Sequence, residues 1–283
     1  MPARYTGRVD SFLRSNQAMW DVWARHHVVS PFYDVAGFKA GARRSRVGLD
    51  ALETRLVGDV TGKSLLHLQC HFGLDTLSWA RRGAVVTGVD FSGEAIGAAR
   101  ALAAETGIPA TFIQSDVYQS PSALDGEFDI VFASHGVLCW LPDLDRWAGV
   151  AAHFLRPGGR LYLIEVHPFP LIFDDRQADR ELRVGYPYFH PEGPLRMERR
   201  GSYAVPDAPV DSVMYEWVHP LSDVLGAITR AGLRLDGFEE YPYLGWAMFP
   251  WMVERPDGMW ELPEGMLPLP LMFSLAAVKA GPP

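Results

Sequence analysis

The chain has 283 residues and a formal net charge of -8, and 48% of its residues are hydrophobic and 21% charged. This balance is typical of a globular protein, and the length suffices for one large domain or for one domain with a substantial insertion. The negative net charge argues against a nucleic-acid backbone as partner, because such binding needs a basic face.

The cysteines and the apolar segments of the sequence indicate the cellular compartment in which the protein resides. Cys70 and Cys139 both lie in apolar stretches, so we predict neither a disulfide nor a cysteine metal site and expect a reducing compartment. No stretch reaches the roughly 18 apolar residues of a membrane span, and the N-terminus lacks the apolar core of a signal peptide. We therefore expect a cytoplasmic protein without a membrane partner, and a homodimer stays open.

Residues 1–60 are predicted to form an N-terminal helical cap. Trp20 and Trp23 are three positions apart, a spacing typical of the apolar face of an amphipathic helix, so both can be core residues. The alternative is a lid over a ligand. In that case Trp23, His27 and Tyr33, with His26, would contact a substrate.

From residue 64 the chain alternates between predicted strands and helices. Strand 64–69 leads into a helix that Gly83 ends, and strand 84–89 then stops at the carboxylate of Asp90. A βαβ unit with an acidic residue about 20 positions after its first turn is typical of a nucleoside-binding site. The turn brings backbone N–H groups to the ligand, and the carboxylate accepts hydrogen bonds from the ribose hydroxyls.

The alternation continues to residue 166 and resumes near residue 220. Ser92 and Gly107 are predicted to cap a helix at its two ends. Further strands are expected at 109–115, 128–133, 161–166, 233–241 and 271–279, and helices after Pro142 and over 220–231. The pair Gly158-Gly159 is expected to form a turn that begins the strand at 161. Such alternation predicts an α/β sheet with helices on both faces.

Two segments interrupt this pattern. Residues 167–219 contain two alternating runs that flank PDAP, which predicts a hairpin inside an inserted β-rich subdomain that covers the substrate. Tyr188 of this insertion is a candidate substrate contact. Residues 242–267 are rich in aromatic residues, Met and Pro, and are expected to be an ordered loop that lines an apolar pocket.

Several motifs in order resemble one family. They are LLHLQCHFG, VTGVDFS, QSDVYQ, FDIVFASHGVLCWLPD and LRPGGRLYLIE, and together they resemble the class I S-adenosylmethionine-dependent methyltransferases of the small-molecule type. The resemblance implies a Rossmann-like, seven-stranded, mostly parallel sheet with an antiparallel last strand over 61–283. It implies S-adenosyl-L-methionine as cofactor and S-adenosyl-L-homocysteine as product.

The first turn departs from the family pattern. His67 replaces an acidic residue, Gln69 and His71 replace two glycines, and Gly73 remains. Side chains there limit how closely a ligand approaches the backbone, which suits a cofactor without a pyrophosphate and argues against NAD. The two histidines can also be packing residues.

The resemblance implies a cofactor site at the carboxyl ends of the strands. The methionine moiety would lie near the first turn, the ribose at the end of the second strand, the adenine beside the residues that follow, and the sulfonium above the end of the fourth strand. In chain order the implied residues are Gln69, Cys70, His71, Gly73, Asp75, Asp90, Phe91, Ser92, Asp116, Val117, Ser134 and His135.

Methyl transfer from a sulfonium is an in-line displacement, so the protein mainly supplies orientation. A general base is needed only when the acceptor still carries its proton, and the candidates at strand ends are His135, Glu165 and His167. The dispersed histidines show no helical ligand pair, so no metal is predicted.

The leading hypothesis is methyl transfer to a nitrogen, oxygen or activated carbon of a small molecule enclosed by the cap and the insertion. One alternative, which the altered first turn favours, is a cyclase or hydrolase acting on S-adenosylmethionine. Another is a cofactor-binding regulator without chemistry.

Overall fold

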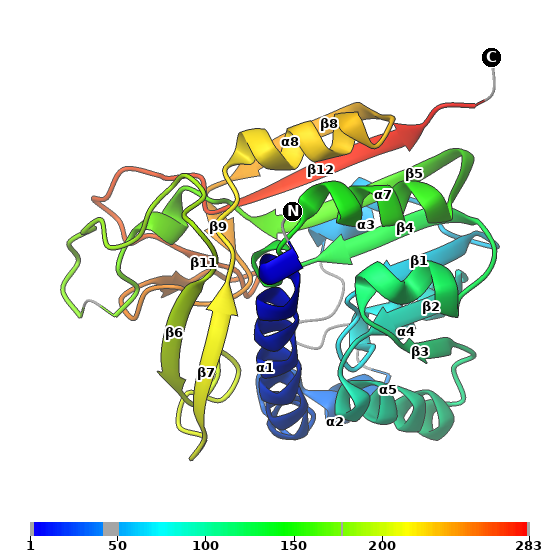
Figure 1. The fold of residues 1–283 in the computed structure, drawn as a ribbon. Helices are drawn as coiled ribbons and strands as arrows, with labels where there is room; N and C mark the ends of the chain where they lie inside the picture. Colours follow the sequence, from blue (N-terminus) through cyan, green and yellow to red (C-terminus); the bar gives the residue numbers. More distant parts are fainter. Residues whose placement is uncertain (1–2, 42–50, 177, 282–283) are drawn as a thin grey trace.

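Seven strands form one sheet in the order β3-β2-β1-β4-β5-β12-β8 (Figure 1). The computed structural model describes residues 3–41, 51–176 and 178–281. All neighbouring strands are parallel except β12, which is antiparallel to β5 and β8. This confirms the predicted Rossmann-like sheet. Its strands are β1 (Ser64–Leu68), β2 (Val85–Asp90), β3 (Thr111–Gln114), β4 (Phe128–Ser134), β5 (Leu155–Val166), β8 (Leu233–Tyr241) and β12 (Met272–Lys279).

Helices cover both faces because successive strand residues point to opposite sides. Leu66 and Leu68 pack in one core cluster with α7 and α8. Leu65 packs in another with α3 and with Trp79 of α4, and α5 joins α4 in a third. The helices around the sheet are α3 (Ala51–Val57), α4 (Leu74–Arg81), α5 (Gly93–Thr106), α6 (Ser120–Ala123), α7 (Leu144–Phe154) and α8 (Leu221–Arg230).

The predicted caps of α5 are confirmed, whereas the prediction that a turn at Gly158-Gly159 begins the fifth strand is wrong. Ser92 Oγ accepts a hydrogen bond from Ala95 N at 3.1 Å, and Gly107 ends the helix with φ 65°. Strand β5 begins earlier, at Leu155, and so runs through both glycines. A Cβ at Gly159 would lie 2.9–3.2 Å from three backbone carbonyl oxygens, so the strand needs glycine at this irregular pairing with β4.

The insertion carries the predicted hairpin, β6 (Leu195–Arg200) with β7 (Asp211–Glu216). The prediction of a loop over 242–267 is wrong in part. This segment contains β9 (Tyr243–Leu244), β10 (Val253–Glu254) and β11 (Trp260–Glu261), which form a small antiparallel sheet. Strands of two residues are too short to show an alternating pattern in the sequence.

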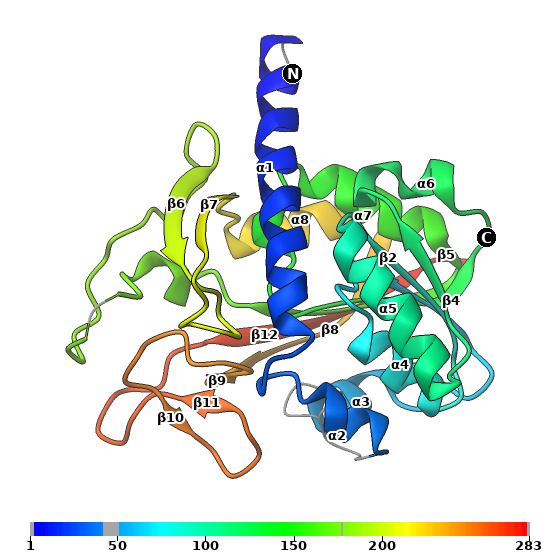
Figure 2. The same cartoon turned by 90° about the horizontal axis from the view of Figure 1, so that it is seen from below.

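The N-terminal segment contains α1 (Ala3–His27) and α2 (Val35–Lys39), and its residues 42–50 lie outside the described part. Helix α1 packs between β7 and α5, as both ribbon views show (Figure 1, Figure 2). The buried Asn16 side chain donates to Tyr215 O at 2.7 Å and accepts from Tyr215 N at 2.9 Å. These bonds attach α1 to the hairpin. No helix in the described residues is long and apolar enough to cross a membrane.

Candidate functional site

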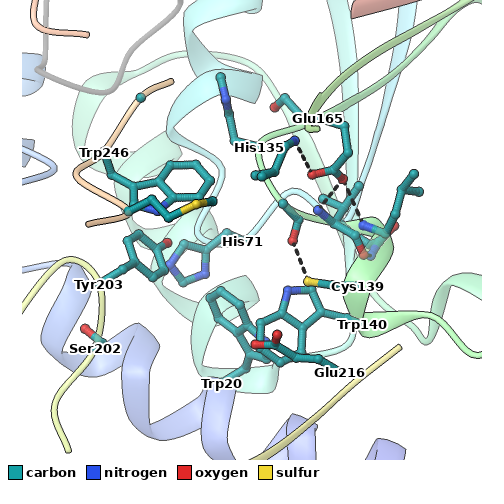
Figure 3. Close-up of a pocket in the computed structure, with 18 of the residues that line it drawn as sticks. Trp20, His71, His135, Cys139, Trp140, Glu165, Ser202, Tyr203, Glu216 and Trp246 are labelled. Atoms are coloured by element: carbon teal, nitrogen blue, oxygen red, sulfur yellow. Dashed lines mark hydrogen bonds between the residues drawn. The ribbon is translucent and has the colours of Figure 1, made fainter. Parts of the chain in front are cut away.

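A cavity of about 1160 Å³ opens at the carboxyl ends of β1, β2, β4 and β5. Its wall draws on α1, the turn after β1, the loops after β2, β3 and β4, the hairpin and the segment 242–267. Figure 3 shows side chains from α1, the turn after β1, the loop after β4, the hairpin and the segment 242–267 around a common space. The topology explains this position, since ligands of open α/β sheets bind beyond the carboxyl ends of the strands.

The turn after β1 keeps a glycine-type backbone. The φ angles of Gln69, His71 and Gly73 are 56°, 52° and 75°. A left-handed conformation costs a residue with a side chain roughly 1–2 kcal/mol, so surrounding contacts must hold Gln69 and His71 in place. At Gly73 a Cβ would lie 2.6 Å from the Phe112 ring, which requires glycine.

The amide of Gln69 is bonded to the protein. Its Nε2 donates to Val137 O at 3.0 Å, and its Oε1 accepts from Trp147 Nε1 at 3.1 Å. Trp147 is a fully buried residue of α7. The side chain therefore joins the end of β1 to α7 and to the loop after β4, even though it also borders the cavity.

His71 connects this turn to α1 and to the hairpin loop. Its Nε2 is 3.0 Å from His27 Nδ1, and His27 Nε2 is 2.9 Å from Ser202 Oγ. Tyr33, in the turn after α1, shares a further hydrogen bond with Tyr203 of the hairpin loop. Burial lowers the pKa of His27 to about 3 and the pKa of His71 well below its usual value, so both rings are neutral near pH 7.

Two carboxylates follow β2 and β3. Asp90 Oδ1 accepts from Ser92 N at 2.9 Å and Asp90 Oδ2 from His71 N at 2.8 Å. Burial raises the pKa of Asp90 to about 6. Asp116 accepts from Tyr118 N at 2.7 Å, and burial raises its pKa. Each carboxylate oxygen has two lone pairs, so these backbone bonds leave acceptor capacity toward the cavity.

The end of β4 carries His135, whose Nε2 is 2.6 Å from Glu53 Oε1 of α3. His135 has φ 60°, and Glu53 is 2% exposed. Glu165 holds the loop that follows, because its Oε2 accepts from Val137 N at 2.8 Å and from Leu138 N at 2.9 Å. Nearby, burial raises the pKa of Asp75 to about 7. The wall around His135 thus holds an imidazole, an acid bonded to it and a second buried carboxyl group.

The structure brings most of the residues expected from the sequence to one cavity. Among the described residues, the wall includes two of the three catalytic candidates, His135 and Glu165, and two of the four substrate candidates, Trp23 and Tyr33. It also includes eleven of the twelve cofactor candidates, one of which is again His135. These eleven are Gln69, Cys70, His71, Gly73, Asp75, Asp90, Phe91, Asp116, Val117, Ser134 and His135.

Four candidates are outside that wall as the described residues define it. Ser92 caps α5 and donates to Asp21 Oδ1 at 2.6 Å. The two ring nitrogens of His27 contact His71 and Ser202. His167 is buried, with Nε2 2.9 Å from Glu240 Oε1, and Tyr188 OH accepts from Leu221 N at 3.4 Å. Their contacts in this structure are with other parts of the protein.

Several wall residues were not predicted as site residues. Trp20 and Trp246 lie in segments whose aromatic content the sequence analysis had noted, so a signal was present. No feature of the sequence indicated that Glu53 or Glu216 would line the site. The further unpredicted wall residues that Figure 3 labels are Cys139, Ser202 and Tyr203.

A parallel sheet with acceptor carboxylates at the ends of β2 and β3 defines a nucleoside-binding Rossmann-like domain. The family described as "Methyltransferase domain" matches residues 66–163. The chain is 30% identical over 177 residues to a ubiquinone biosynthesis O-methyltransferase of Photorhabdus laumondii, a match that covers 62% of this chain and 65% of the relative. It is 29% identical over 207 residues to the protein of that name from Proteus mirabilis, covering 73% and 79%.

Solved structures share the fold. An S-adenosylmethionine-dependent methyltransferase from Mesorhizobium loti superposes with a TM-score of 0.55 at 20% identity, over 79% of this chain and 94% of that one. The glycopeptide N-methyltransferase MtfA, solved with S-adenosylmethionine, gives 0.52 at 18% identity, over 88% and 98%. The family match identifies residues 66–163 as a methyltransferase domain, and the solved structures show that the chain shares the fold of S-adenosylmethionine-dependent methyltransferases.

Proposed function

We propose that this protein transfers the methyl group of S-adenosylmethionine to a hydroxyl oxygen or an uncharged amine nitrogen of a small molecule held in the cavity. The observation that carries the proposal is the contact between His135 Nε2 and Glu53 Oε1 at 2.6 Å in the cavity wall. A hydroxyl or amine loses its proton when it is methylated, so a positioned base speeds the reaction. The names of the curated relatives favour oxygen as the methylated atom.

The residues present fit the cofactor. Asp90 has acceptor capacity for the two ribose hydroxyls, and Asp116 has it for the adenine amino group. The cavity, about 1160 Å³, exceeds the 300–1,000 Å³ typical of ligand pockets, so it has room for an acceptor beside the cofactor. When bound, S-adenosylmethionine supplies an electrophilic methyl group on a positively charged sulfur.

His135 is proposed as the base and Glu53 as the residue that orients it. In the tautomer whose Nε2–H donates to Glu53, Nδ1 carries the lone pair that takes the acceptor's proton. The Glu53 carboxylate then stabilises the imidazolium that forms, as the acid of a catalytic triad does. Glu165 is assigned a positioning role, since it holds the backbone that follows His135.

The test is a screen of small phenols and amines with the purified protein, followed by S-adenosylhomocysteine release. With an acceptor in hand, His135→Asn and Glu53→Gln should lower kcat by roughly 10²–10⁴-fold, while calorimetry finds S-adenosylhomocysteine bound as tightly as before. The matched control is His153→Asn, because His153 is exposed on α7. Wild-type kcat in His135→Asn would contradict the proposed base.

The same assay separates the two alternative hypotheses. A cyclase or hydrolase would consume S-adenosylmethionine without forming S-adenosylhomocysteine and methylated product in equal amounts. A regulator would show no turnover at all. Turnover that Asp90→Ala abolishes would exclude the regulator.

A further inference from the structure

Glu216, the last residue of β7, places a carboxylate in the cavity wall that the proposed methyl transfer does not use. Met214 lies two residues earlier on the same face of the strand and also lines the cavity. Trp217, the residue after Glu216, donates its backbone N–H to Cys139 O at 2.7 Å. This bond fixes the end of β7 against the short helix η2 (Leu138–Trp140), which follows the His135 loop.

Indole rings form the neighbouring wall. The rings of Trp20 and Trp140 meet edge to face, with centroids 5.4 Å apart and planes at 84°. Trp20 also packs against the His71 ring at 5.3 Å, so this wall reaches the cofactor turn. Figure 3 draws Glu216, Trp20 and Trp140 in the same part of the pocket. The faces of indole rings attract cations, most strongly when water is excluded.

The charge balance of the cavity also favours a cation. Its described wall contains eleven Asp or Glu residues and four Arg residues. Arg199 is the cation that influences Glu216, but the Arg199 guanidinium is engaged by Asp175 at 2.6 Å. Burial raises the pKa of Glu216 to about 7, because a carboxylate that is kept from water without a full counter-charge is destabilised. A bound cation would stabilise the carboxylate.

We propose that Glu216, Trp20 and Trp140 form a recognition site for a protonated amine on the methyl acceptor. This inference rests on the proposed function and narrows it: the acceptor is a compact molecule that carries an ammonium group. That group is held at the end of β7 while the reacting atom lies toward His135. The eleven-to-four excess of acids disfavours acceptors that carry a carboxylate or phosphate.

The test compares three probes of similar size on protein saturated with S-adenosylhomocysteine: phenethylamine, 2-phenylethanol and 3-phenylpropionate. Calorimetry should find phenethylamine bound at least tenfold more tightly than 2-phenylethanol, and 3-phenylpropionate the weakest. In Glu216→Gln the preference for the amine should fall at least fivefold. In the matched control Glu181→Gln it should persist, because Glu181 lies in the same insertion with its side chain 70% exposed.

Each outcome is decisive. A wild-type protein without preference for the amine, a preference that survives Glu216→Gln, or binding of none of the three probes would overturn the site. Trp20→Leu gives a second variant, and its preference should fall by a similar factor. Failure of the wild-type protein to bind S-adenosylhomocysteine would instead count against the proposed function, so the two failures are distinguishable.

Discussion

Restoring the family's glycine at position 69 should destabilise the protein. Gly would relieve the left-handed strain at φ 56°, a gain of about 1–2 kcal/mol. It would also increase the conformational freedom of the unfolded chain, a loss of about 0.5–1 kcal/mol that offsets much of this gain. What remains is the loss of two hydrogen bonds: Trp147 Nε1–H of α7 now donates to Gln69 Oε1 at 3.1 Å, and Val137 O accepts from Gln69 Nε2 at 3.0 Å. A buried donor left without a partner costs about 1–3 kcal/mol.

The free energy of unfolding of Gln69→Gly should therefore fall by about 1–3 kcal/mol, as measured by urea denaturation. The melting temperature should fall by about 2–5 °C. Gln69→Asn is the matched control, because Asn also tolerates the left-handed region but is one methylene too short to reach Trp147. It should lose nearly as much stability. A Gln69→Gly protein as stable as the wild type would refute this account of the turn.

Two further predictions concern the end of β2. Asp90→Asn should weaken S-adenosylhomocysteine binding at least about tenfold, or about 1.4 kcal/mol, because an amide cannot accept both ribose hydroxyls while holding the two backbone N–H groups. Since burial raises the pKa of Asp90 to about 6, wild-type affinity should fall as pH drops from 8 through 6 to 5, where Asp90 becomes neutral. That dependence should be much smaller in Asp90→Asn, and calorimetry at both pH values checks it. Ser92→Ala should lower the free energy of unfolding by about 1–2 kcal/mol, since it removes the cap of α5 and the bond to Asp21; an unchanged urea midpoint would contradict this.

The proposed cofactor side of the site follows from local sequence. Asp90 and Asp116 could be predicted because Asp90 ends β2 and Asp116 lies two residues after β3, and parallel strands end at one edge of the sheet. The proposed acceptor side could not. Glu53 and His135 are 82 positions apart, and only the packing of α3 against the sheet brings them together.

His71 shows how tertiary contacts override a local rule. The sequence indicates that a side chain replaces glycine and changes the turn. The structure instead keeps the left-handed backbone and uses the side chain to contact His27 and Trp20. Which contacts offset the strain depends on segments far away in the chain, and local pattern carries no information about them.

The junction between α1 and the hairpin loop has a consequence for synthesis on the ribosome. Its two side-chain pairs, His27 with Ser202 and Tyr33 with Tyr203, are separated by 175 and 170 positions. At about 5–20 residues per second, the partner of α1 emerges roughly 10–35 s after α1 itself. During that interval the indoles of Trp20 and Trp23 have no hairpin to cover them. Helix α1 is therefore made well before the hairpin that covers it, and it offers chaperones an apolar surface while the intervening residues are translated.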